Sequence, residues 1–147
     1  SVFFIRPALD CALLPGVEGA GPAAQRSIAR WAAHRAYAEA GLNDVDWIAP
    51  ALEAMDLGHE LPAPFSELRH SWDRFFDDPA IPQTFVDSID GSRGEFLKQA
   101  MAVPALLDAM EPVPLRAALD ALYAAAATYG SDHPRLFDEV RRRFSLP

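Results

Sequence analysis

Cysteine and lysine are both scarce in this sequence, which has one of each, Cys11 and Lys98, among its 147 residues. A single cysteine excludes a disulfide within the chain, and disulfide-free chains are typical of the cytoplasm. The other basic residues are 12 arginines, and 27 residues are alanine. This usage is typical of a bacterial chain encoded by a GC-rich genome. We therefore expect a cytoplasmic protein.

Long apolar runs are missing as well. No stretch approaches the roughly 18 consecutive apolar residues that a membrane-spanning helix needs. The apolar residues 1–14 lack the basic start of a signal peptide. Strand signals are nearly absent, because the apolar row in residues 1–6 has no second strand to pair with. We expect an extended arm or a short helix there, and no contact with a membrane.

The sequence contains no catalytic or cofactor motif. His59 and Glu60 begin an H-E-x-x-H pattern, but Ala63 stands where that zinc-binding motif needs its second histidine. Internal repeats of the length that solenoid proteins use are also absent. We predict no cofactor and assign no enzymatic activity, so binding functions are the simplest expectation.

Positive charge is lacking in the middle of the chain. Residues 39–95 carry 13 acidic residues against three arginines, and the net charge of the whole chain is −8. This segment excludes the basic footprint that nucleic-acid binding requires. It is compatible with a basic protein partner and also with plain solubility.

Helix-forming residues are abundant, above all in Pro114–Tyr129. Pro114 suits the first position of a helix, and Gly130 suits the left-handed residue just past the end. Apart from Arg116 and Asp120, which share one face, the segment is uncharged, and a helix that is apolar on most sides is usually buried. We expect this helix at the centre of the fold, with its Arg116 edge reaching water.

The other helices are predicted from apolar periodicity and from their proline and glycine boundaries. A short one is expected within residues 7–14, and longer ones over 22–40, 43–57, 64–77, 82–89, 96–110 and 132–144. Residues 15–21 are predicted to form a loop.

Prolines and capping signals refine these boundaries. Pro50 and Pro104 should kink or split their helices, because proline lacks an N–H and clashes with the preceding turn. Asn43 and Asp46 resemble a capping box, and the S-x-x-E sequence at 92–95 is one.

The sequence therefore predicts one all-α domain over residues 1–147, an irregular bundle of about seven helices. Residues 1–21 would form an arm, a short helix and a loop. Residues 22–147 would form antiparallel helical hairpins packed round Pro114–Tyr129. A tetratricopeptide-like array of helical hairpins is the alternative fold.

Three cation-capable residues, Arg26, Arg30 and His34, recur every four residues along one predicted helix. Such a line can hold a carboxylate or a phosphate. Trp31 or Trp72 would supply an aromatic wall, so an anionic small molecule is one candidate ligand. The alternative is a solvated helix face.

Two weaker site candidates remain. His70, Asp73 and Asp77 share a helix face and carry the ligand atoms that a divalent metal accepts, although that face is the one expected in water. Cys11 is a candidate nucleophile without any local signature, and a free cysteine most often packs as a small hydrophobe.

Three hypotheses for function follow from these patterns. The first is a non-enzymatic interaction or regulatory protein, whose acidic centre, including Asp73, Asp77 and Asp78, meets a basic protein partner. The second is a helical binder or enzyme that takes an anionic ligand at the arginine line. The third is an oligomerisation or scaffold module, with the oligomeric state left open.

Overall fold

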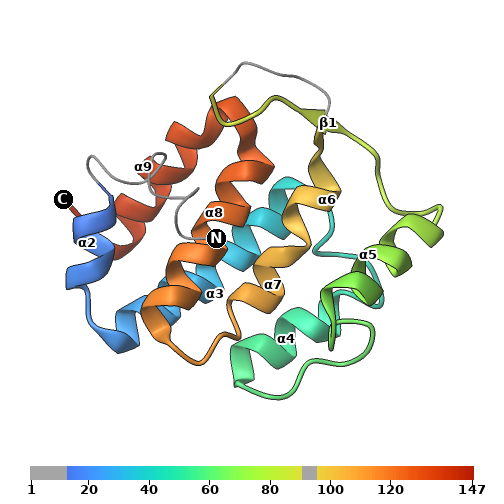
Figure 1. The fold of residues 1–147 in the computed structure, drawn as a ribbon, viewed down its shortest axis with the longest axis horizontal. Coiled ribbons are helices and arrows are strands. Elements are labelled where there is room, and N and C mark those ends of the chain that lie inside the picture. The colour runs from blue at the N-terminus through green and yellow to red at the C-terminus, as the bar shows by residue number, and fades with distance from the viewer. Residues whose placement is uncertain (1–12, 91–95) are drawn as a thin grey trace.

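The computed structural model describes residues 13–90 and 96–147, and most of this part is helical, as the predicted all-α class requires (Figure 1). The helices are α2 (Leu14–Gly19), α3 (Pro22–Glu39), α4 (Ala49–Leu57), α5 (Leu68–Asp77), α6 (Lys98–Ala102), α7 (Pro104–Asp108), α8 (Pro114–Tyr129) and α9 (His133–Phe144). A 3-10 turn, η1 (Gly130–Asp132), and two short strands, β1 (Phe85–Val86) and β2 (Phe96–Leu97), complete the described elements. Across these ranges no helix is long and apolar enough to span a membrane.

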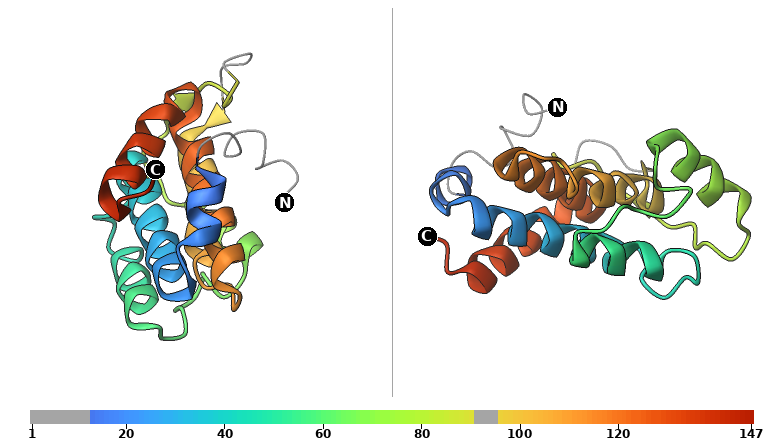
Figure 2. Two further views of the ribbon diagram at one scale, coloured as in Figure 1. Left: turned by 90° about the vertical axis from the view of Figure 1, so that its left-hand side faces the viewer. Right: turned by 90° about the horizontal axis from the view of Figure 1, so that it is seen from below.

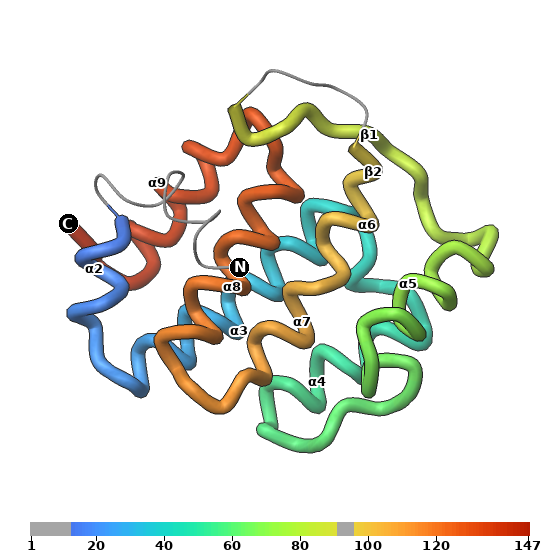
Figure 3. The backbone as a smooth tube through the Cα atoms, in the orientation of Figure 1, coloured from blue at the N-terminus to red at the C-terminus, as the bar shows by residue number. Residues whose placement is uncertain are grey.

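The helix α8 has the predicted bounds, and α3, α6, α7 and α9 all pack against it (Figures 1 and 3). The side chains of Ala117, Ala121 and Ala125 are fully buried, and such small side chains let neighbouring helices approach closely. Arg116 is exposed, as expected, but Asp120 is half-buried on the same helix.

Two layers of helices are visible when the molecule is turned. Figure 2 shows α3 and α4 on one side, with α6 and α7 on the other. The apolar side chains between them form one continuous core, which includes Ile28, Tyr37, Leu106 and Leu122. Tyr37 crosses between the layers, because its hydroxyl donates to the Val103 carbonyl oxygen at 2.9 Å.

The helix predicted over residues 43–57 is shorter than expected. It begins at Ala49, so the capping box expected at Asn43 is wrong, and Pro50 lies in the first turn instead of kinking the helix. Residues 42–48 form turns in which Leu42 and Ile48 are fully buried. Proline is well suited to a first turn, since its missing N–H has no intrahelical partner there.

The segment at α2 also differs from the prediction, and here too a proline lies in the first turn of the helix. The loop predicted over residues 15–21 is wrong in its first part, because Leu14–Gly19 is helical with a proline in the first turn. Val17 is completely buried. The arm and short helix predicted over residues 1–14 lie almost wholly outside the described residues, and so does Cys11.

The segment between α5 and α6 differs most from the prediction. The helix predicted at 64–77 begins only at Leu68, and the helix predicted at 82–89 is wrong, because β1 lies there. β1 pairs with β2 in antiparallel register, Phe85 opposite Leu97 and Val86 opposite Phe96. The capping box predicted at 92–95 lies outside the described residues.

Pro104 splits the helix predicted over 96–110, as expected. α6 ends at Ala102, and α7 starts at Pro104, which occupies the first turn. Both short helices pack against α8. The turn at Pro104 therefore keeps the chain in contact with α8 over the length of both helices.

Gly130 ends α8 with φ of 64°, a value that glycine adopts without strain. A Cβ at this position would overlap the Asp87 carbonyl oxygen and Val86 Cγ2. The glycine thus allows the segment after β1 to lie directly against the end of α8.

Candidate functional site

The three residues of the predicted arginine line face different partners. Arg26 donates from Nη1 to the Ala109 carbonyl oxygen at 2.7 Å and from Nη2 to the Pro112 carbonyl oxygen at 3.1 Å. His34 Nε2 lies 2.8 Å from Asp56 Oδ2. Arg26 thus fastens the α7–α8 connection to α3, and His34 reaches α4.

Arg30, between them, has a buried Nε that makes no hydrogen bond with any described residue. Trp31 packs edge-on against Phe144, with ring centroids 6.0 Å apart. Trp72 donates from Nε1 to the Ala100 carbonyl oxygen at 3.1 Å. The two tryptophans thus pack on different elements, α9 and α6, and anion binding at this line stays a prediction.

The residues of the metal candidate are exposed on α5. His70 Nδ1 lies 3.7 Å from Glu67 Oε2, and Asp73 and Asp77 are open to solvent. Among the residues that the structure describes, no three histidine, cysteine or acidic side chains are grouped so as to hold a metal ion.

Asp78, the third residue of the predicted interaction surface, is tied into the fold. Its carboxylate accepts from Trp47 Nε1 at 2.9 Å and from the Ala80 backbone N–H at 2.9 Å, and Arg74 Nη1 lies 3.6 Å away. The Trp47 hydrogen bond is the main reason that the pKa of Asp78 lies below its usual range. Asp78 therefore orients Trp47, which packs on Phe65 and Phe75.

Many acidic side chains between α3 and the end of α5 have no cation beside them. We use the name acidic edge for six exposed residues that lack an ion-pair partner within the described ranges. They are Asp44, Asp46, Glu53, Glu60, Asp73 and Asp77. They belong to α4, α5 and the connections next to them, which lie toward the same end of the molecule (Figures 1 and 2).

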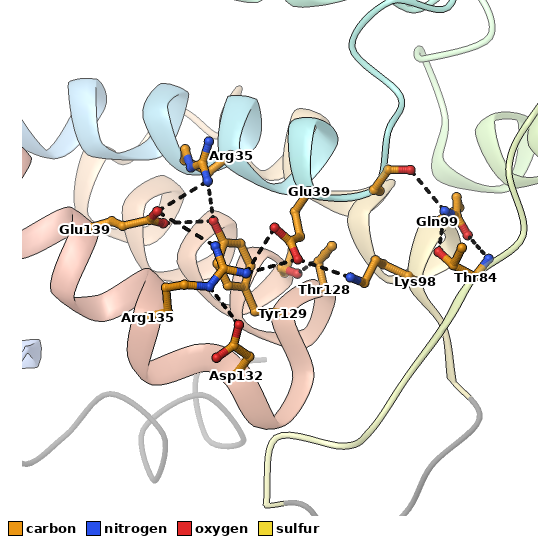
Figure 4. Close-up of polar contacts among 12 residues, drawn as sticks. Arg35, Glu39, Thr84, Lys98, Gln99, Thr128, Tyr129, Asp132, Arg135 and Glu139 are labelled. Atoms are coloured by element: carbon orange, nitrogen blue, oxygen red, sulfur yellow. Dashed lines mark hydrogen bonds and ion pairs between the residues drawn. The ribbon is translucent and has the colours of Figure 1, made fainter.

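Acidic residues near α9 differ from those of the acidic edge, because they form ion pairs with arginine and lysine (Figure 4). Arg135 lies 2.7 Å from Asp132 and 3.1 Å from Glu39, and Lys98 Nζ also lies 3.1 Å from Glu39. These contacts connect α3, α6 and α9. The contrast shows that the acidic edge is a local feature.

Tyr129 lies at the centre of the same network. Its hydroxyl accepts from Arg35 Nη2 at 2.7 Å and donates to Glu139 Oε1 at 2.8 Å. Burial, followed by the Glu139 hydrogen bond, raises the pKa of Tyr129 to about 12. Arg135 also stacks over its ring, 4.5 Å from the centroid. These contacts join side chains of α3, α8 and α9, so the cluster fastens α9 to α3 and α8.

A cavity of about 320 Å³ lies between α5, α6, α7 and α8. Its wall includes two aromatic side chains, Trp72 and Tyr123, and two carboxyl groups, Asp108 and Asp120. Met101, Pro104 and three alanines, Ala100, Ala124 and Ala127, complete the lining. Of the residues predicted for a ligand site, Trp72 is the one that lines this cavity.

The carboxyl groups at the cavity lie close to one another and to Glu111. Burial, followed by the charges of Asp120 and Glu111, raises the pKa of Asp108 to about 7. Burial and a hydrogen bond with Asp120 raise the pKa of Glu111 to about 7 as well, although Arg116 and Arg26 act in the opposite direction. These are the strongly perturbed carboxyl groups of the described chain, and such groups mark candidate sites.

Glu111 Oε2 and Asp120 Oδ1 are both buried and accept no hydrogen bond within the described structure. The negative charge of Asp120 disfavours ionisation of Glu111, in agreement with the raised pKa of Glu111.

The sequence patterns do not reveal this carboxyl cluster. They predict Asp120 on the water-facing edge of α8, and Asp108 and Glu111 belong to no motif. The available signal was that three acidic residues flank the proline-rich turn before α8. No family model, curated protein or solved structure matches the chain.

Proposed function

We propose that this protein is a non-enzymatic interaction protein that docks a basic protein partner on its acidic edge. The observation that carries the proposal is the local lack of cations: residues 43–78 hold nine acidic residues and two arginines. One of those arginines, Arg74, is already engaged with Asp78 and with the Trp47 ring. The six carboxylates of the acidic edge are left without compensation within the described structure.

Exposed apolar side chains lie among these charges. Phe76 on α5 is 58% exposed, and Leu57 at the end of α4 is 60% exposed. Phe76 stands between Asp73 and Asp77 along α5. A partner with basic and apolar side chains would match both features, since charge sets association rate and specificity while buried apolar groups supply affinity.

The helical framework suits a docking role. We propose that the helices form an irregular bundle of hairpins round α8, in preference to a tetratricopeptide-like array. Asp78, Trp47 and the aromatic rings beneath them fix α5 on this framework. Little reorganisation would then be needed on binding, which favours affinity. The compartment that we propose is the cytoplasm, in keeping with a single cysteine.

A matched pair of charge reversals tests the proposal. Asp73→Lys/Asp77→Lys reverses two charges on the acidic edge. Glu18→Lys/Asp138→Lys makes the same change in net charge at exposed positions on α2 and α9. Each protein is immobilised, exposed to lysate of its own host, and the captured proteins are quantified against wild type. We expect at least one basic partner to lose roughly tenfold in affinity, about 1.4 kcal/mol, with the edge variant and not with the control.

Two results would contradict the proposal. One is that the edge variant and the control variant both capture the same proteins, in the same amounts, as wild type. The other is a partner whose association rate does not fall with ionic strength, because steering by the acidic edge must be screened by salt. Self-association of the wild type that survives the edge substitutions would favour the oligomerisation hypothesis instead.

A further inference from the structure

The cavity between α5, α6, α7 and α8 is separate from the acidic edge, although α5 contributes to both. Trp72 lines the cavity, whereas Asp73 and Asp77 face solvent. We propose that this cavity binds a small organic cation, an amine or a quaternary ammonium group, against the carboxylates of Asp108 and Asp120. The inference is independent of the proposed protein docking.

Charge in the cavity is the first argument. Asp108 and Asp120 have no arginine, lysine or histidine within ion-pair distance among the described residues. Two arginines act on the neighbouring Glu111, Arg116 on α8 and Arg26 on α3, and Arg26 already donates to two backbone carbonyls. Both residues are half-buried at the cavity, Asp108 as well as Asp120. A carboxylate that is partly removed from water without a partner is costly, so an entering cation would supply the missing countercharge.

The unpartnered oxygen is the second argument. Asp120 Oδ1 is buried and accepts no hydrogen bond within the described structure, although its residue lines the cavity. Buried acceptors are nearly always satisfied by a donor. An ammonium N–H, or the polarised methyl groups of a quaternary ammonium, would meet this need where an anion would not.

The aromatic walls are the third argument. The rings of Trp72 and Tyr123 border the same space, and both ring types attract cations through their faces. The hydrogen bond from Trp72 Nε1 to the Ala100 carbonyl holds the indole in place. The Tyr123 hydroxyl makes no hydrogen bond with the described residues, so it is available to a ligand.

Size and ligand geometry favour an organic cation over a metal ion. A volume of about 320 Å³ lies at the lower end of the range for small-molecule pockets. The described side chains include no group of three that could hold a metal. The cavity therefore suits a molecule of a few heavy atoms whose charge meets the carboxyls and whose apolar part meets Met101 and Pro104.

Binding should be linked to proton release. Asp108 faces Asp120, Glu111 and, from α3, Tyr37, while Glu111 faces Asp120, Arg26 and Arg116. With pKa values of about 7, Asp108 and Glu111 are mostly protonated at pH 6 and ionised at pH 8. Since the cation requires the ionised form, its affinity should rise about tenfold between these pH values.

The experiment uses choline and its neutral carbon isostere, 3,3-dimethylbutan-1-ol, as probes. Each is titrated into the full chain at pH 8, with ¹H–¹⁵N NMR following the backbone and the Trp72 indole N–H. We expect choline to shift resonances of residues 100–127 and Trp72, with at least tenfold higher affinity than the isostere. Asp120→Asn should abolish this preference, while Asp138→Asn, an equal charge change on α9, should preserve it.

Several outcomes would overturn the inference. Equal affinities for choline and the isostere would show an apolar cavity that does not recognise charge. Shifts spread over the acidic edge, or an equal loss in Asp138→Asn, would show unspecific attraction. The comparison of the two probes on wild type needs no variant, so it decides the question even if Asp120→Asn folds poorly.

Discussion

At the scale of single residues, Asp108 is a group whose burial opposes folding. Its carboxyl has a pKa of about 7 in the folded chain, against an ordinary value of 3.8. The folded state therefore binds more protons than the unfolded state between about pH 4 and pH 7, and stability falls as pH rises through this window. Above pH 7 the full penalty is present, and below pH 4 it is absent.

Asp108→Asn should remove this penalty. We expect the variant to be more stable than wild type by about 2 kcal/mol at pH 8, with the gain shrinking steadily toward pH 4.5. Urea unfolding at the two pH values measures the difference. Asp138→Asn, on the exposed surface of α9, should show no such pH-dependent gain. A variant that is equally or less stable at pH 8 would mean that Asp108 is ionised without cost.

The predicted site residues also show that a residue type indicates a possible ligand but does not identify the residue's partner in the fold. Arginine binds anions, so the sequence predicts an anion site at Arg26, yet its guanidinium donates to the carbonyl oxygens of Ala109 and Pro112. These acceptors lie more than 80 residues further along the chain, so no local pattern points to them. The single charged face of α8 predicts Asp120 in water, but Asp120 lines a cavity together with Asp108 of α7. The periodicity of a helix predicts which residues share a face, but it does not predict which other element packs against that face.

At the scale of elements, proline explains both the successes and the errors. Pro22 and Pro114 are predicted to start helices, and both lie in a first turn. Pro50 is predicted to kink its helix but lies in the first turn, whereas Pro104 splits its helix as expected and lies in the first turn of α7. The sequence was ambiguous because apolar periodicity continues across each proline. Burial of Ile48 and of Val103 accounts for that continuity without any helix running through.

Gly130 is the helix boundary at which substitution should lower stability most. Gly130→Ala should destabilise the fold by well over 1 kcal/mol, because the alanine would combine a left-handed φ with an overlap on Asp87 and Val86. Gly58→Ala also has a positive φ of 70° but contacts only Arg30 Nη2 at 3.7 Å, so it should cost about 1 kcal/mol. Thermal and urea unfolding measure both.

Gly19→Ala supplies the control for this series. Gly19 is the last residue of α2, and a Cβ there would meet nothing within 4 Å. Alanine should stabilise the helix by about 0.5 kcal/mol, because it restricts the unfolded chain. If Gly130→Ala were no worse than Gly58→Ala, the close approach of the segment after β1 to α8 would not be part of the stable fold.

At the scale of the whole molecule, two electrostatic contributions oppose each other. The acidic edge destabilises the fold through repulsion between unpaired carboxylates, and the net charge of −8 has the same sign. The pairs round Arg135 and Glu39 stabilise it, but exposed pairs contribute only about 0–1 kcal/mol each. Salt screens both, so the sign of the salt effect reports which is larger.

We expect repulsion to be the larger contribution. Raising NaCl from about 10 mM to about 150 mM shortens the screening length to about 8 Å and should increase the free energy of unfolding by about 1 kcal/mol. Asp73→Asn/Asp77→Asn should lose a clear part of this gain, because it removes two charges of the acidic edge. Glu39→Gln should enlarge the gain, because it removes the carboxylate that Lys98 and Arg135 share. If salt instead lowers the free energy of unfolding, the ion pairs round Arg135 and Glu39 contribute more than the repulsion within the acidic edge. That result would contradict the premise that the acidic edge carries uncompensated charge for a basic partner.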